Sequence, residues 1–306
     1  MPQGVRLQVP FFPQEDYHCG PAALAGLLNY NGLQTDPLQL ARQVYIPGRK
    51  GSLQVEMTAA IRSYERVAYP LPAGKQREMA QLIGALDAGY PVLVLQNLGI
   101  EWLPQWHYAT VTGYNLATAE LILNSGTHED YHMSISTFEH TWKRSNYWAL
   151  VVGPATDIPP FATHAIWNQA AVDLESSGHI DAAFTAYQAA LRRWPNNKVA
   201  LLGKGNTAYA LQRYSIAADS FYQFARFHSA QAATGWNNLA HALSALHCPK
   251  AARSAVLLAL ALSPEDRAIR SSADEMAATP ENPNTSAPPA SSNQCSHWQS
   301  RMAQHS

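Results

Sequence analysis

Apolar residues in the first third of the chain recur at the spacing of helices that each bury one side. The pattern predicts helices over residues 21–30, 37–44, 55–65 and 78–88. Asp36 is placed to cap the second helix and Pro37 to begin its first turn, while Asn31-Gly32 is a usual stop for the first.

Later runs are rich in branched and aromatic residues, which is typical of β-strands. These runs predict strands over residues 92–98, 107–114, 120–124 and 147–152. Because the helices come first and the strands follow, the order favours an α+β domain over alternating βαβ units.

A break follows this region at residues 153–163, where three prolines and a glycine occur in eleven residues. Such a run is typical of a linker. The predicted organisation is therefore an α+β domain over residues 1–155, a linker over 156–163, an all-α repeat domain over 164–269 and a tail over 270–306.

The repeat domain is predicted from positions that recur 69 residues apart. Trp167 and Trp236 have this offset, as do Pro195 and Pro264, and a less regular middle copy contains Gly205. The positions resemble the tetratricopeptide pattern, in which small residues let paired helices approach closely. Three copies are predicted, and an unrelated helical bundle is the alternative.

The tail over residues 270–306 is rich in Ser, Pro, Ala and Asn, with few large apolar residues. Such a segment buries too little apolar surface to offset the entropy of ordering. We therefore predict that the tail is disordered.

Composition and charge narrow the classes of partner. Lys and Arg number 21 against 22 Asp and Glu, so the balance gives no long-range attraction for nucleic acid, and no such partner is expected. No apolar run reaches the ~18 residues of a membrane span. The three cysteines lack any CxxC spacing, which supports neither a disulfide framework nor a zinc finger.

The first candidate for chemistry is Cys19, which directly precedes a predicted helix. Unpaired N–H groups and the dipole at that helix end favour negative charge, so the pKa of this thiol is expected below its ordinary value. Gly20 leaves room for a substrate backbone, and Gln14 is a candidate to stabilise an oxyanion. The alternative is that Cys19 is a small buried apolar residue.

A thiolate nucleophile needs a base, and the base needs an orienting group. His107 opens one predicted strand, and the return strand ends in Asn124. In such a hairpin the two residues fall near the same end, so Asn124 is predicted to hydrogen-bond one imidazole nitrogen and leave the other facing Cys19. Taken singly, His107 fits a packed histidine and Asn124 a turn residue.

Several segments together carry a family resemblance: Gln14, Cys19-Gly20-Pro21-Ala22, 85–97, His107-Tyr108, 111–114 and Asn124. They resemble the papain-like cysteine peptidases of the double-glycine leader (bacteriocin-processing) family, in particular stand-alone bacterial members fused to tetratricopeptide repeats. The resemblance implies Gln14 as oxyanion-hole residue, Cys19 as nucleophile, His107 as general base and Asn124 as orienting group. Leader peptidases usually have Asp-Pro where this chain has Asn124-Ser125.

Other candidates for chemistry are weaker. His18 is a less suitable base because adjacent side chains at a helix start usually point apart. His128, Glu129, Asp130 and His132 include metal-ligand types, but a solvated loop is predicted for them, and neither a metal nor a cofactor is expected.

The remaining cysteines and four tryptophans are expected to have structural roles. Cys248 is predicted to pack in a bend between repeat helices, and Cys295 lies in the predicted disordered tail. Core burial is expected for the tryptophans near the site, with a wall of a peptide cleft as the alternative. These tryptophans are Trp102, Trp106, Trp142 and Trp148.

The sequence thus predicts a bacterial cysteine peptidase that hydrolyses peptide bonds, followed by a repeat domain that recruits a protein substrate or partner. One alternative is an inactive peptidase-like binding module. Another is thiol acyl transfer to an amine, or attack on a non-peptide amide. The first residues lack the apolar core of a signal peptide. The resemblance favours the bacterial cell envelope or periplasm if such a segment lies upstream, and the cytoplasm is expected otherwise.

Overall fold

The computed structural model describes residues 3–14, 18–74, 78–100, 102–278 and 292–305. The chain forms two compact units, residues 1–179 and 180–306, which are described separately. Among the described residues, none of the helices has the length and apolar character needed to cross a bilayer.

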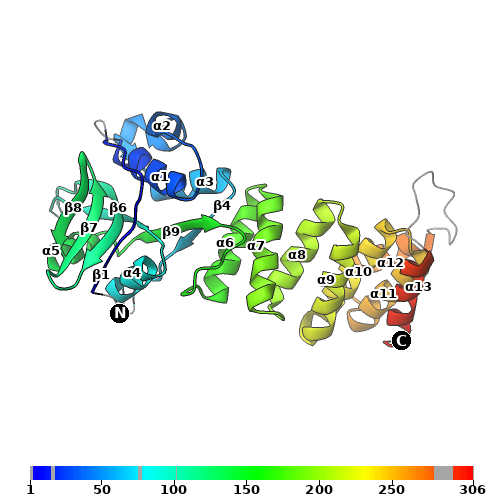
Figure 1. Cartoon of the computed structure of the whole chain (residues 1–306). Helices are drawn as coiled ribbons and strands as arrows, with labels where there is room; N and C mark the ends of the chain where they lie inside the picture. Colours follow the sequence, from blue (N-terminus) through cyan, green and yellow to red (C-terminus); the bar gives the residue numbers. More distant parts are fainter. Residues whose placement is uncertain (1–2, 15–17, 75–77, 101, 279–291, 306) are drawn as a thin grey trace. The chain divides into compact units, whose positions relative to one another are not determined.

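An antiparallel sheet is the centre of the first unit (Figure 1). Its described strands follow the order β4-β9-β5-β6-β7-β8, and β1 also pairs with β6. The strands are β1 (Gly4–Arg6), β4 (Arg66–Pro70), β5 (Val92–Asn97), β6 (Trp106–Asn115), β7 (Glu120–Ser125), β8 (His128–Ser134) and β9 (Ala149–Pro154). A separate pair joins β2 (Tyr45–Ile46) to β3 (Gly51–Ser52). The prediction of an α+β domain is confirmed.

Helices pack on the strands of this unit and are α1 (Cys19–Tyr30), α2 (Pro37–Val44), α3 (Gln54–Ser63), α4 (Glu78–Asp87) and α5 (Ile135–Lys143). The first three lie together (Figure 1) and share one buried cluster with alternate strand residues such as Leu93 and Leu95. As predicted, Asp36 caps α2, with its Oδ1 accepting from the Gln39 N–H at 2.9 Å. Helix α5, which the apolar pattern did not predict, is capped by Ser134.

Helix α1 places Cys19 beside Tyr108 of β6. Its apolar residues Leu24, Leu27 and Leu28 are fully buried against the strands. A Cβ added to Gly20 would lie 2.7 Å from Ser52 Oγ. Gly20 therefore allows close packing of α1 against β3, and the prediction that it leaves open space for a substrate is wrong.

The boundary between the units falls later than the predicted linker over 156–163. Helix α6 (His164–Ser176) packs on β4 and belongs to the first unit. Its Asp173 accepts a hydrogen bond from Arg62 of α3 at 2.5 Å. The proline-rich segment is also attached to this unit, because the Phe161 ring packs edge-on against Tyr69 and Tyr90.

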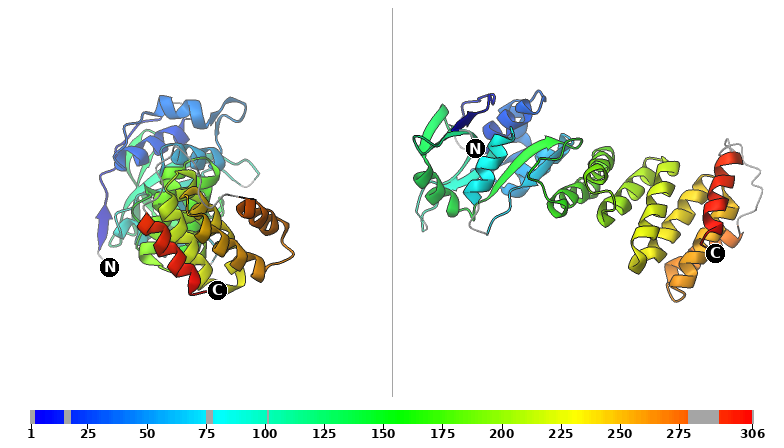
Figure 2. Two further views of the ribbon diagram at one scale, coloured as in Figure 1. Left: turned by 90° about the vertical axis from the view of Figure 1, so that its right-hand side faces the viewer. Right: turned by 60° about the horizontal axis from the view of Figure 1, so that its bottom comes forward.

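The second unit is a stack of helices, as predicted (Figure 2). They are α7 (Ile180–Arg193), α8 (Lys198–Ala210), α9 (Tyr214–Phe227), α10 (Ala232–Ala245), α11 (Pro249–Leu262), α12 (Arg267–Ala278) and α13 (Ser292–Ala303). Each helix from α8 to α11 packs on the one before it. A Cβ added to Gly205 would lie 2.3 Å from the Phe221 ring, so a small residue is required at this helix crossing.

The prediction of a disordered tail is wrong for its described parts. Helix α12 and helix α13 both pack on α11, and Trp298 and Met302 of α13 are buried in the core of the second unit. Cys248 and Cys295 form a disulfide with a Cα–Cα separation of 5.2 Å. The composition failed to predict this because two apolar side chains and one covalent bond are enough to hold a short helix on an existing core.

Candidate active site

Three of the four predicted site residues line one open cleft of about 740 Å³ in the first unit: Gln14, Cys19 and His107. Cys19 is the first residue of α1, and His107 is the second residue of β6. Gln14 precedes α1 and is attached to the turn after β7 by a hydrogen bond from its N–H to the Gly126 carbonyl (3.1 Å). The cleft therefore combines Gln14 from the segment before α1, Cys19 from α1 and His107 from β6.

The thiol of Cys19 is largely buried, and burial raises its pKa above the ordinary value. The backbone N–H groups of Tyr108, Gly20 and Cys19 itself hydrogen-bond to the sulfur and act in the opposite direction, but more weakly. The prediction of a lowered pKa at the helix start is thus wrong, because desolvation of the thiolate outweighs the N–H groups around it.

The imidazole of His107 is held by one hydrogen bond among the described residues, between its Nε2 and Ser125 Oγ at 2.9 Å. When Nε2 carries the proton and donates to Ser125, Nδ1 is left with a lone pair that can accept a proton. Burial lowers the pKa of His107, so the ring favours the neutral form that a base requires.

Asn124 is not bonded to His107, which corrects the predicted orienting contact. Its Nδ2 donates to the Val9 carbonyl (3.2 Å), and its Oδ1 accepts from the Asp130 N–H (3.3 Å). The strand register explains why: Asn124 pairs with Thr110, three residues from His107. Since successive side chains alternate between the faces of a strand, positions 107 and 110 point to opposite faces. Ser125, the next residue, is on the face that reaches the ring.

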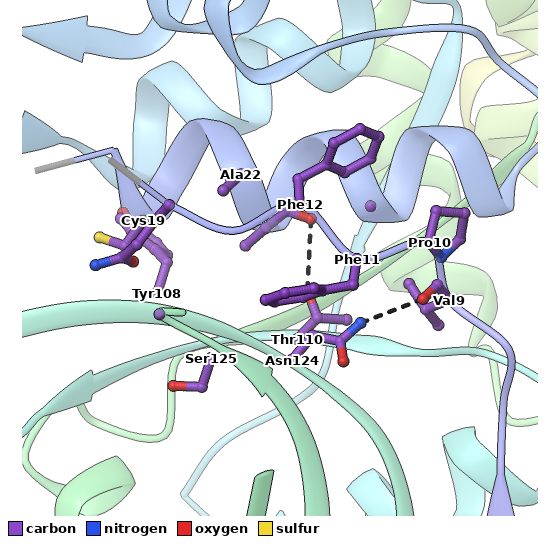
Figure 3. A pocket seen from close by; sticks show the side chains of 14 residues that line it. Val9, Pro10, Phe11, Phe12, Cys19, Ala22, Tyr108, Thr110, Asn124 and Ser125 are labelled. Atoms are coloured by element: carbon purple, nitrogen blue, oxygen red, sulfur yellow. Dashed lines mark hydrogen bonds between the residues drawn. The ribbon is translucent and has the colours of Figure 1, made fainter. Parts of the chain in front are cut away.

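Asn124 instead lines a small cavity with Gln14 and Cys19, shown in Figure 3. The cavity is about 10 Å³, which is room for about one water molecule. The side-chain oxygen of Gln14 is buried and has no hydrogen-bond partner among the described residues. No internal bond therefore fixes this end of the amide, and rotation about its terminal bond exchanges the acceptor for an N–H donor.

The weaker candidates are engaged elsewhere. The ring of His18 packs edge-on against Tyr45, with centroids 5.0 Å apart. The polar run after β7 is strand β8 rather than a loop, and His132 Nδ1 lies 3.1 Å from Glu120 Oε2. Within the described residues no three His, Cys, Asp or Glu side chains converge as a metal site.

The tryptophans divide into two groups. Trp142 is buried, as expected, and Trp148 packs edge-on against Tyr108. Trp102 and Trp106 are exposed, so the expectation of core burial is wrong for both. Trp102 lies in the connection between β5 and β6, and Trp106 is the first residue of β6.

Comparison with known proteins assigns residues 6–150 of the first unit to a family. Residues 6–150 match the model of the Peptidase_C39 like family. This part of the chain belongs to that family. At the family level, the C39-like domain is therefore of the cysteine-peptidase type.

Solved structures similar to parts of the chain include two that are described as peptidases. A protein described as a C39-like peptidase from Bacillus anthracis is 18% identical, with 49% of this chain and 98% of that chain covered and a TM-score of 0.41. The peptidase domain of Streptococcus ComA is 21% identical, with 48% and 99% covered and a TM-score of 0.39.

The first tetratricopeptide domain of Spaghetti (RPAP3), bound to an HSP90 peptide, is 14% identical, with 37% of this chain and 90% of that chain covered and a TM-score of 0.35. No curated protein sequence matches the chain significantly. The assignment of the C39-like domain therefore rests on the family match over residues 6–150.

Two residues that sequence reasoning missed belong to the site. Ser125 contacts the base, and the Tyr108 backbone N–H contacts the sulfur. Each directly follows a predicted site residue in the sequence. Which of two neighbouring side chains reaches the site depends on the face of the strand that each one occupies.

Proposed function

We propose that the C39-like domain hydrolyses peptide bonds with Cys19 as nucleophile and His107 as general base. The observation that supports this most directly is that the thiol and the imidazole line the same cleft, with the backbone N–H after His107 hydrogen-bonded to the sulfur. Because Ser125 occupies Nε2, the proposed base is the other ring nitrogen, Nδ1.

The proposed reaction is acyl transfer through sulfur. Nδ1 of His107 takes the thiol proton, and the thiolate attacks the peptide carbonyl carbon. The negative charge that forms on the carbonyl oxygen is stabilised by the Cys19 N–H and the Gln14 side-chain amide. The imidazolium then gives its proton to the leaving amine, and water hydrolyses the thioester, which restores the free thiol.

Ser125 is proposed to position His107, whereas Asn124 is proposed to stabilise the backbone around the site. Ser125 Oγ fixes the tautomer through Nε2, and Asn124 links the Val9 and Asp130 backbones next to the small cavity. The Ser125→Ala variant should therefore lower kcat with little loss of stability. The Asn124→Ala variant should mainly lower the free energy of unfolding, by roughly 1–3 kcal/mol.

The proposal is tested by hydrolysis of fluorescein-labelled casein and by labelling with a peptide chloromethyl ketone. Cys19→Ala and His107→Ala should abolish hydrolysis, and Gln14→Ala should lower kcat by roughly 10²–10³-fold. Leu38→Ala, on the exposed side of α2, serves as the control and should retain activity. Labelling of Cys19→Ala equal to that of the parent would contradict the assignment.

A second candidate function is an inactive peptidase-like binding module. The raised pKa of Cys19 favours this reading, because a protonated thiol is a poor nucleophile. Binding of unfolded casein by the parent without any cleavage, unchanged in Cys19→Ala, would support it over hydrolysis.

The helices of the second unit are proposed to recruit a protein substrate or partner. Stacked helix pairs present an extended surface suited to a peptide segment. Variants in exposed residues of this unit should then reduce cleavage of a folded protein target more than cleavage of a short peptide. Equal losses on both would refute recruitment.

A further inference from the structure

Large apolar side chains are exposed together in the connection between β5 and β6 and at the first residue of β6. We use "apolar hairpin" for Leu98, Ile100, Trp102, Leu103 and Trp106, all of which are exposed. Trp102 is 81% exposed and Leu103 is 65% exposed. Concentration of such residues on one short element is uncommon unless the element binds something.

The apolar hairpin is held in place by hydrogen bonds to its base. Asn97 is 3% exposed, and its Oδ1 accepts from the N–H groups of Gly99 (3.0 Å) and Gln105 (2.9 Å). Arg144, the residue that directly follows α5, donates to the carbonyl oxygens of Asn97 and Gly99. The exposed side chains are therefore presented on an ordered base, which lowers the entropic cost of binding.

The ordered apolar surface continues into the catalytic cleft. Pro104, Gln105 and Trp106 line the same cleft as Cys19 and His107. Trp106 directly precedes His107 in β6. A flat lipid surface would touch the tip of the hairpin, whereas only a chain lying in the cleft contacts both the tip and the residues beside His107.

We infer that the apolar hairpin binds a bulky apolar side chain of the peptide substrate and thereby selects which bond is cleaved. This inference rests on the proposed peptidase function, which it extends to substrate class. The expected substrate is an extended peptide with Leu, Ile, Met or an aromatic residue at a fixed position relative to the cleaved bond. Trp102, Leu103 and Trp106 are the specificity-determining residues.

The test profiles cleavage of a tryptic digest of bacterial proteins, with products identified by mass spectrometry. The parent should enrich large apolar residues at one position, with roughly tenfold preference over Ala. The double variant Trp102→Ala/Leu103→Ala should lose most of this preference while Cys19 is still alkylated by iodoacetamide. The matched control is Leu38→Ala, because Leu38 is 60% exposed on α2 and is not part of the cleft lining.

A second measurement keeps this test independent of turnover. Immobilised Cys19→Ala protein should retain peptides rich in large apolar residues from the same digest, and adding the double substitution should abolish the enrichment. Hydrolysis by the double variant with unchanged selectivity would overturn the inference. It would also be overturned if the parent bound phosphatidylcholine–phosphatidylglycerol vesicles and the double substitution abolished this binding without altering selectivity. Selective retention of apolar peptides, without any hydrolysis by the parent, would overturn the proposed peptidase function and support peptide binding by the apolar hairpin alone.

Discussion

At the scale of single residues, the site is governed by burial. Cys19 and His107 are both desolvated, and the pKa shifts that result favour the neutral thiol and the neutral imidazole. The helix start contributes N–H groups to the sulfur, but these do not compensate for the lost hydration. In the resting protein both shifts therefore favour an uncharged pair.

This charge state predicts the pH dependence of thiol alkylation. Because the thiolate forms only above the raised pKa, the rate of iodoacetamide labelling of Cys19 should rise with pH and reach its plateau only in alkaline solution. Cys19→Ala should show no labelling under non-reducing conditions, since the other cysteines are bonded to each other. A plateau that begins below roughly pH 7 would indicate a stabilised thiolate and contradict the prediction.

At the scale of elements, close approach of helices depends on small residues. Gly205 of α8 faces the Phe221 ring of α9, and Gly203 of the same helix faces the Tyr187 ring of α7. Each ring occupies the volume that a side chain would need. Small residues at the crossings were predicted from the recurring positions, whereas the particular ring against each glycine follows only from the packed structure.

The packing predicts a destabilised Gly205→Ala variant. The added methyl group would lie 2.3 Å from the Phe221 ring, so the free energy of unfolding should fall by about 1–3 kcal/mol in urea denaturation. Gly84→Ala in α4 is the matched control, because a Cβ there meets no atom within 4 Å and should stabilise the helix by roughly 0.5–1 kcal/mol. Equal effects of the two substitutions would show that the crossing is not tightly packed.

At the scale of the whole molecule, a covalent bond secures the end of the second unit. The Cys248–Cys295 disulfide joins the start of α11 to α13, and Arg301 of α13 pairs with Asp219 of α9 at 3.0 Å. Disulfides persist in oxidising compartments and are rare in reducing ones. We therefore expect the bond in protein that folds under oxidising conditions.

The disulfide predicts a count of free thiols. Denatured, unreduced protein should take up one maleimide per chain, on Cys19, and three after reduction. The Cys248→Ser/Cys295→Ser variant should lose roughly 2–4 kcal/mol of stability in urea denaturation, with cleavage of short peptides unchanged. Three maleimides before reduction would show that the bond does not form.

The local pattern of the sequence was sufficient for the main elements of the first unit. Helices α1 to α4 and strands β5, β6, β7 and β9 occur within a few residues of the predicted bounds. Residue type and order also named Cys19, His107 and Gln14 as candidates, and these three residues line one cleft. These features depend on short-range preferences, such as apolar spacing, caps and turns, which a single segment contains.

Other features of the protein were decided only by the tertiary structure, because they depend on contacts between segments that are distant in the sequence. The register of β6 against β7 placed Ser125 rather than Asn124 at the imidazole. Burial under the surrounding chain reversed the expected pKa shift of Cys19, and the pairing of Cys248 with Cys295 required two segments 47 residues apart to meet. A sequence pattern states which face of an element is apolar, but partner, register and solvent exclusion are set only when the elements pack together.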